Sequence, residues 1–194
     1  MGSTLKVDNI VGTSGTSAPI TLSGDTLTAT LGSSSTLALG VTQKIIGFAA
    51  YASGNGSIAQ STWSNFAAVG TWVERFDTNS DYASGVFQPS KSGVYLCGYT
   101  ISFNLIDSGE VLWAALAKNW SSGDPTSEGY GYERQTLGPS GGNIDASITG
   151  SALIQLDASA NDTVKPLVYH NDGAGTITYK ENRTSFWGCY IGEV

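Results

Sequence analysis

The sequence predicts an all-β protein that folds as an antiparallel sandwich, and three observations support that prediction. Short apolar runs recur along residues 44–194, with clusters of turn residues between them. Windows of about ten residues or more carry no apolar stripe at the helical period that is free of glycine interruptions. Charged residues make up only 13% of the chain, whereas 25 glycines are available for turns. Many short strands separated by turns are typical of sandwiches.

Each expected strand is a short run that is apolar throughout or alternates apolar and polar residues, and each ends at a turn. The runs cover residues 45–52, 62–66, 71–76, 86–88, 94–105, 110–119, 143–156, 163–170 and 184–192. The stretch 76–95, FDTNSDYASGVFQPSKSGVY, links several of them, and its aromatic side chains are expected in the core. Residues 54–59 match the glycine spacing of a dinucleotide-binding loop, but no strand–turn–helix unit surrounds them. We therefore expect a surface turn there.

Residues 1–43 differ from the rest and predict a separate N-terminal segment, a short stem of extended β structure, with the head domain in residues 44–194. The segment holds three charged residues, Lys6, Asp8 and Asp25, and is rich in Thr, Ser and Gly. A single chain of such short alternating pieces cannot bury its apolar faces alone, whereas three copies wound together can. The alternative is a disordered leader.

Composition excludes several classes of protein. The net charge is −7 and no basic run occurs, so the electrostatic signature of a nucleic-acid-binding protein is absent from the sequence. We expect no secretion signal, because no positively charged leader precedes an apolar stretch, and no membrane span, because no apolar run reaches about 18 residues. The protein is therefore expected to be made in the cytoplasm. Cys97 and Cys189 are too few for a disulfide framework, and both are expected to be buried, reduced and inward-facing.

The sequence does not predict an enzyme. Residues 138–142 fit the G-x-S-x-G pattern of a hydrolase nucleophile elbow, and Asp157 and His170 follow in the hydrolase order. The elbow requires a helix after the serine, whereas a glycine pair and an alternating strand follow Ser140. A single histidine and loop acids without calcium-loop spacing predict no metal site, and no cofactor is expected.

Four landmarks occur in order between residues 48 and 191. They are Phe48-Ala49-Ala50, then Phe76, Tyr82, Gly85, Phe87, Pro89, Gly93 and Tyr95, then the alternating run 153–156 leading to Val164, and finally residues 186–191, FWGCYI. This order resembles the globular-head family of complement's first component, which shares a jelly-roll fold with tumour necrosis factor (TNF). The resemblance implies an antiparallel jelly-roll sandwich that packs as a compact homotrimer on a stalk. The stem lacks the Gly-X-Y period of collagen and is similar to the β stems of phage fibre proteins.

Residues 119–142 are expected to form a long exposed loop, and such loops on a rigid scaffold often carry binding sites. Its aromatic side chains are candidates to stack on sugar rings, and its charged side chains are candidates to bind sugar hydroxyls. The candidate ligand-binding residues are Trp120, Asp124, Glu128, Tyr130, Tyr132 and Arg134. The alternative is that the aromatic residues pack against a neighbouring subunit.

These features predict a homotrimeric virion fibre protein of a tailed phage, located on the virion surface, whose head attaches to host-surface glycan without turnover. Three weak sites on one axis would give durable attachment through avidity. The stem is expected to bind other virion proteins of capsid or tail, and its proposed anchoring residues are Leu5, Val7, Ile10, Ile20 and Leu22. The main alternative is a capsid-decorating or cement protein that stabilises the shell. A polysaccharide-degrading enzyme is a third hypothesis, but no carboxylate pair supports it. Neither nucleic acid nor a membrane is expected as a partner.

Overall fold

The computed structural model describes residues 45–106, 110–125, 129–136, 144–171, 173 and 175–193. The predicted stem, with its five proposed anchoring residues, lies outside the described residues. Glu128 and the G-x-S-x-G match at 138–142 also lie outside them. The division into stem and head therefore stays a prediction.

The described head consists of strands and one short 3-10 helix, η1 (Phe66–Ala68). The strands are β1 (Gly47–Ala52), β2 (Gly56–Ala59), β3 (Ser64–Asn65), β4 (Trp72–Asp77), β5 (Tyr82–Ala83), β6 (Val86–Phe87), β7 (Gly93–Ile106), β8 (Val111–Lys118), β9 (Gly129–Thr136), β10 (Ile144–Leu156), β11 (Val164–His170), β12 (Thr176–Tyr179) and β13 (Ser185–Gly192). All their pairings are antiparallel. The all-β antiparallel prediction is confirmed.

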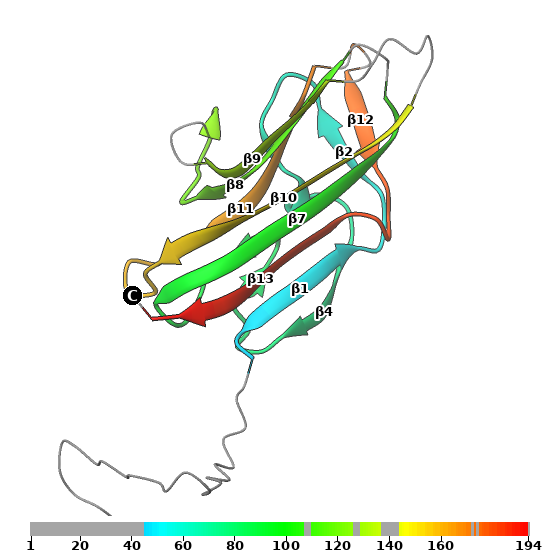
Figure 1. Ribbon diagram of the computed structural model, residues 1–194. Helices are drawn as coiled ribbons and strands as arrows, with labels where there is room; N and C mark the ends of the chain where they lie inside the picture. Colours follow the sequence, from blue (N-terminus) through cyan, green and yellow to red (C-terminus); the bar gives the residue numbers. More distant parts are fainter. Residues whose placement is uncertain are drawn as a thin grey trace, which may run out of the picture. The chain divides into compact units, whose positions relative to one another are not determined.

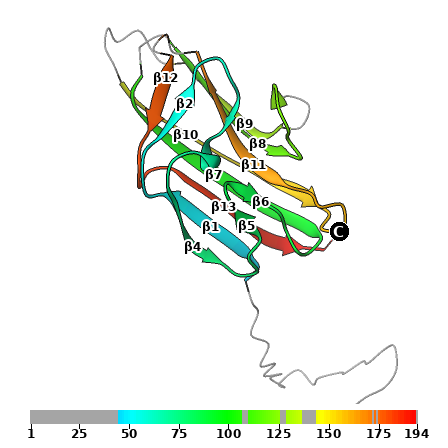
Figure 2. The same ribbon diagram turned by 180° about the vertical axis from the view of Figure 1, so that it is seen from behind.

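The strands form two layers (Figure 1). Sheet A has the strand order β2-β12-β7-β13-β1-β4, and β10 also pairs with β7. Sheet B has the order β5-β6-β11-β8-β9, and β3 also pairs with β11. The view from behind shows β5 and β6 of sheet B in front of β13 and β1 of sheet A (Figure 2). The chain changes sheet between β7 and β8, between β9 and β10, and again on either side of β11, so distant segments share one core.

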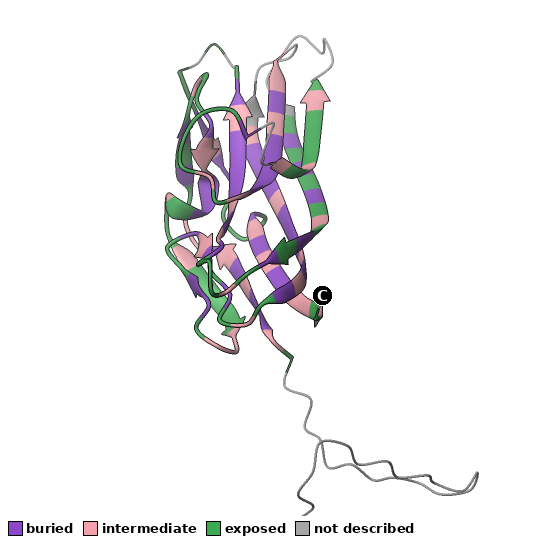
Figure 3. Cartoon of the chain, turned by 90° about the vertical axis from the view of Figure 1, so that its left-hand side faces the viewer, coloured by how far each residue is buried: buried purple, intermediate pink, exposed green. Residues whose placement is uncertain are grey.

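The core lies between the sheets and is rich in aromatic rings. Phe48 of sheet A stacks on Tyr82 and Phe87 of sheet B, with ring centres 4.9 and 4.6 Å apart. Its edge contacts Phe186 at 4.8 Å. Burial alternates along several strands, as Figure 3 shows, because successive side chains point to opposite faces of a sheet. These rings join the two layers, and aromatic pairs at such distances stabilise a core beyond their buried area.

One aromatic residue of the 76–95 stretch is not in the core. Phe76 is 47% exposed, whereas the other aromatic residues of the stretch are buried, namely Tyr82, Phe87 and Tyr95. Phe76 pairs with Ala49 of β1. Because Phe48 and Ala50, on either side of Ala49, point into the core, the Ala49–Phe76 pair faces outward from sheet A.

Two short segments differ from the prediction. Residues 54–59 do not form only a turn, because Gly56–Ala59 is strand β2 and pairs with β12. The predicted strand 62–66 is shorter than expected, since β3 ends at Asn65 and the chain turns into η1. The Asn65 side chain accepts a hydrogen bond from the Ala67 backbone N–H at 3.1 Å. This cap starts the helix and ends the strand.

Candidate functional site

Four aromatic side chains gather on the outer face of sheet B. Trp113 of β8 lies between Leu112 and Ala114, which are in the main core, so its ring faces the opposite way. It contacts rings that come from β9, β11 and the turn before β3, with ring centres 5.8 to 6.3 Å apart. We call this group the aromatic cluster, and its members are Trp63, Trp113, Tyr132 and Tyr169.

Strand register brings the cluster together with a positive charge. Trp113 is paired with Tyr169 on β11 and with Arg134 on β9, so three neighbouring strands present one row of side chains. The guanidinium carbon of Arg134 lies 5.6 Å from the centre of the Trp113 ring. This distance is within the range of a cation–π contact.

A hollow of about 380 Å³ lies beside the aromatic cluster. Its walls combine rings with polar side chains, and they are Trp63, Val111, Trp113, Asp124, Arg134, Tyr169 and Asn171. A larger hollow of about 660 Å³ lies among the turns near residues 79–90, but no aromatic ring lines it. Flat apolar surfaces with a few polar groups are typical of small-molecule sites, so the smaller hollow is the better candidate.

The electrostatics of the hollow are mixed. Burial raises the pKa of Tyr132 to about 12; the Asp124 carboxylate adds to the rise and the Arg134 guanidinium opposes it. The phenol of Tyr132 therefore stays neutral at physiological pH and keeps its proton for donation. The indole Nε1–H of Trp113 is shielded from solvent and has no acceptor among the residues that the structure describes.

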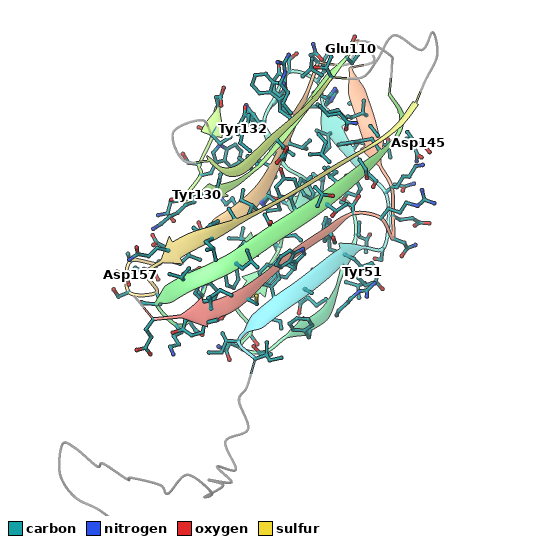
Figure 4. All side chains as sticks on the ribbon, viewed as in Figure 1. Tyr51, Glu110, Tyr130, Tyr132, Asp145 and Asp157 are labelled. Atoms are coloured by element: carbon teal, nitrogen blue, oxygen red, sulfur yellow. The ribbon has the colours of Figure 1, made fainter. Side chains whose placement is uncertain are left out.

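A bulge in β9 separates the two exposed tyrosines of that strand. Gly131 has a φ of +55°, and the register of β8 with β9 shifts at this point. Tyr130 is paired with Leu116, whereas Tyr132 contacts Trp63 and Trp113. Both tyrosines are labelled in Figure 4.

The structure brings together three of the six predicted binding residues. Asp124 and Arg134 line the hollow, and Tyr132 belongs to the aromatic cluster. Tyr130 lies outside, beyond the bulge. Trp120 also lies outside, and its Nε1–H donates to the Gly123 carbonyl at 2.9 Å. The expectation of one continuous loop at 119–142 is wrong, because residues 129–136 form strand β9 against β8.

Sequence reasoning missed Trp63, Trp113, Tyr169 and Asn171. Trp113 and Tyr169 lie within predicted strands, where alternation alone does not tell which side faces the core. Both strands carry small or aliphatic residues on both of their faces, so no pattern in the sequence singled out either ring. Trp63 gave no signal, because its position depends on the two-residue strand β3 pairing with β11.

Part of the outer face of sheet A is apolar. Leu153 is paired with Leu96, and Leu96 is paired with Cys189, so the three side chains form a row across β10, β7 and β13. The Ala49–Trp187 pair and Phe76 lie in the next row. Leu153 is 61% exposed and Phe76 47%. We call this surface the apolar face of sheet A and define it by Phe76, Leu96, Leu153, Trp187 and Cys189.

Only one of the two cysteines is buried. Burial raises the pKa of the Cys97 thiol to about 12, with a further contribution from Cys189. Cys189 is half-buried and faces outward, which corrects the expectation that both point inward, because Cys97 is paired with Gly188 and Cys189 follows on the other side of the strand. Both cysteines are free.

The one histidine of the sequence lies in the interior of the fold. His170 is buried, with its Nε2 3.0 Å from the Ile58 carbonyl oxygen. No group of three or more His, Cys, Asp or Glu residues is placed to hold a metal ion within the described ranges. No helix in this part of the chain is long and apolar enough to cross a membrane.

Comparisons with known proteins bear on the fold. A scan against protein-family models finds no match, and a search of curated proteins finds none either. Among solved structures, the chain is similar to Eiger TNF from S. frugiperda, with a TM-score of 0.55 at 14% identity, over 77% of this chain and 94% of that one. It is also similar to murine APRIL at pH 5.0, with a TM-score of 0.54 at 11% identity, over 76% of this chain and 100% of that one. The TNF-like jelly-roll fold implied by the landmarks is thus confirmed, and at this identity the likeness shows the fold alone.

Proposed function

We propose that the chain is a homotrimeric virion fibre protein of a tailed phage, whose head attaches the particle to host-surface glycan. The observation that carries the proposal is the contrast between the two outer faces of the sandwich. One face carries an exposed apolar surface, and the other holds a hollow lined by rings and polar groups. Because the two sheets of a sandwich turn opposite faces outward, covering the first leaves the second accessible.

Self-association would cover the apolar face of sheet A. Leu153, Leu96 and Cys189 lie side by side in one row across three neighbouring strands rather than singly. Contiguous apolar patches on soluble proteins mark interaction surfaces. Closed rotational symmetry is the usual arrangement for identical subunits, and the homotrimer implied by the sequence landmarks is one such arrangement.

Attachment would use the hollow on sheet B. Aromatic faces bind the C–H faces of sugar rings, and charged or amide groups bind hydroxyls. A single site of this kind is weak, but three heads on one axis and several fibres on one particle raise the effective affinity strongly. Binding without turnover is enough for this role.

The virion assignment is supported by residues 1–43. Their Thr-, Ser- and Gly-rich alternating pieces are similar to the stems of phage fibre proteins. A stem of this kind would join the head to capsid or tail proteins.

Adsorption experiments test the proposal. Purified full-length protein, added in excess, should compete with particles for host cells, and particles lacking the protein should adsorb poorly. Unchanged adsorption together with capsids that leak on heating would instead identify a capsid-decorating protein. Release of reducing sugar from host polysaccharide by the purified protein would identify an enzyme.

A further inference from the structure

The geometry of the sheet B hollow points to its ligand class: we infer that it binds an uncharged pyranose, as the terminal or near-terminal sugar of a surface glycan. This inference rests on the proposed attachment function and deepens it. The hollow measures about 380 Å³. That is near the lower end of the roughly 300–1,000 Å³ of small-molecule sites, which suits a short saccharide.

The charges that line the hollow disfavour an anionic ligand. Arg134 would attract a carboxylate or sulfate, but Asp124 lines the same hollow and would repel it. Both side chains act on the Tyr132 hydroxyl, and in opposite directions. The chain as a whole carries a net charge of −7, which further disfavours polyanions. A neutral ligand gains hydrogen bonds from both groups without a charge conflict.

A quaternary ammonium ligand, the other common partner of aromatic clusters, is disfavoured for a different reason. The Arg134 guanidinium already lies 5.6 Å from the centre of the Trp113 ring. A second cation beside Arg134 would be repelled, whereas an uncharged sugar would not.

Sugar hydroxyls can accept hydrogen bonds from side chains on the walls of the hollow. Arg134 and Asn171 both line it, and the Asn171 Oδ1 is held by the Val111 backbone N–H at 2.7 Å. The Tyr132 ring packs against Trp63 and Trp113, two of the walls, and so holds their rings in place.

Titration of the full-length protein tests the inference. The probes are the methyl glycosides of glucose, galactose, mannose and N-acetylglucosamine, compared with glucuronic acid, N-acetylneuraminic acid and choline. Binding is followed by tryptophan fluorescence and by isothermal calorimetry. At least one neutral glycoside should saturate at millimolar concentration, and each charged probe should bind about tenfold more weakly or worse.

A matched pair of variants locates the site. Tyr132 and Tyr130 are each 36% exposed on β9, on either side of Gly131, and only Tyr132 belongs to the aromatic cluster. Tyr132→Ala should weaken glycoside binding about tenfold, and Tyr130→Ala should leave it unchanged. Trp113→Ala, which removes one ring from the wall of the hollow, should also weaken it. Circular dichroism of each variant verifies the fold.

The outcomes separate this inference from the proposed function. Tighter binding of a charged probe, an equal loss in both tyrosine variants, or no binding of any neutral glycoside would overturn the neutral-pyranose site. If the protein still competes for host cells in those cases, attachment stands and uses another surface. If glycosides bind but the protein never competes for host cells, the site stands and the attachment role falls.

Discussion

Arg134 and Trp113 are directly paired across β8 and β9, and the guanidinium carbon lies 5.6 Å from the ring centre. The bulge at Gly131 creates this pair. If the register of Leu116 with Tyr130 continued without the shift, Glu133 would lie opposite Trp113. One extra residue in β9 therefore exchanges an acid for a base beside the hollow.

Gly131→Ala should destabilise the head and disturb the hollow. A non-glycine residue at a φ of +55° is strained, and a Cβ there would lie 3.1 Å from the Ser151 carbonyl oxygen. We expect a loss of about 1–3 kcal/mol in the free energy of unfolding, measured by urea denaturation. Gly123→Ala is the control, because Gly123 has a φ of +82° with nothing within 4 Å. If both variants lost the same free energy of unfolding, the loss would come from the backbone strain of a positive φ alone, and the bulge at Gly131 would have no special role.

Asp162 should make stability depend on pH. Its carboxylate is 5% exposed, lies 2.7 Å from Lys118 Nζ and accepts from Asn119 Nδ2 and from the Asp157 backbone N–H. Burial alone would raise the pKa of Asp162, but these partners outweigh it and hold the pKa below its ordinary value of 3.8. Because the pKa of Asp162 is lower in the folded protein than in the unfolded chain, its carboxylate stabilises the fold at any pH above the unfolded-state pKa. This stabilisation is lost as the pH falls through the folded-state pKa.

Asp162→Asn tests this dependence. At pH 7 the free energy of unfolding of the variant should be lower than that of wild type by about 1.5–3 kcal/mol, which is the typical contribution of a hydrogen bond to a charged group. Below about pH 3 the difference from wild type should shrink, because wild-type Asp162 is then protonating as well. Asp145→Asn, which breaks the more exposed pair with Lys180, should cost under about 1 kcal/mol. If Asp162→Asn lowered the free energy of unfolding equally at pH 7 and below about pH 3, the charge-based explanation would be wrong.

The parts of the fold that the sequence predicted are those with long, regular patterns. The expected runs 94–105 and 143–156 lie within one residue of β7 and β10 at each end. The short strands β2 and β12 were missed, because four residues carry too little pattern and their strand geometry depends on pairing with each other. Phe76 was misassigned because an aromatic residue at a strand end does not reveal which face it occupies.

The site was predicted in part for a related reason. Residue type identified Asp124, Tyr132 and Arg134 as binding candidates, but Tyr130 could not be separated from Tyr132 without the bulge at Gly131. Trp113 faces Tyr169 through pairing with β11, a contact between residues far apart in sequence. Local pattern carries no information about such pairs.

Removal of residues 1–40 should leave a folded head that no longer joins the particle. The described strands and both sheets lie within residues 45–193, and we therefore expect this part of the chain to fold without residues 1–40. Circular dichroism and thermal unfolding of the truncated protein check the fold, and its recovery in purified particles checks incorporation. Incorporation at the wild-type level would place the docking surface in the head.

Leu153→Lys should break self-association. Leu153 lies near the C-terminal end of β10 in a row with Leu96 and Cys189, and a lysine there would place a charge in an interface that excludes water. Burying an unpaired charge should weaken association by about 2 kcal/mol or more per interface. Sedimentation velocity should show a trimer for wild type and a monomer for the variant. Tyr130→Lys, on sheet B, is the control, and a trimeric Leu153→Lys protein would move the interface away from this face.

Cys189 provides an independent chemical probe of the same face. In a homotrimer that covers the apolar face of sheet A, its half-buried thiol should react slowly with iodoacetamide, and in the Leu153→Lys monomer it should react severalfold faster. Cys97 is an internal reference, because burial raises its pKa to about 12 and keeps it unreactive at pH 8 in both proteins. Mass spectrometry of the labelled peptides separates the two sites. Equal Cys189 rates in a trimeric wild type and a monomeric variant would mean that the trimer leaves this row exposed, because a covered thiol cannot react as fast as an uncovered one.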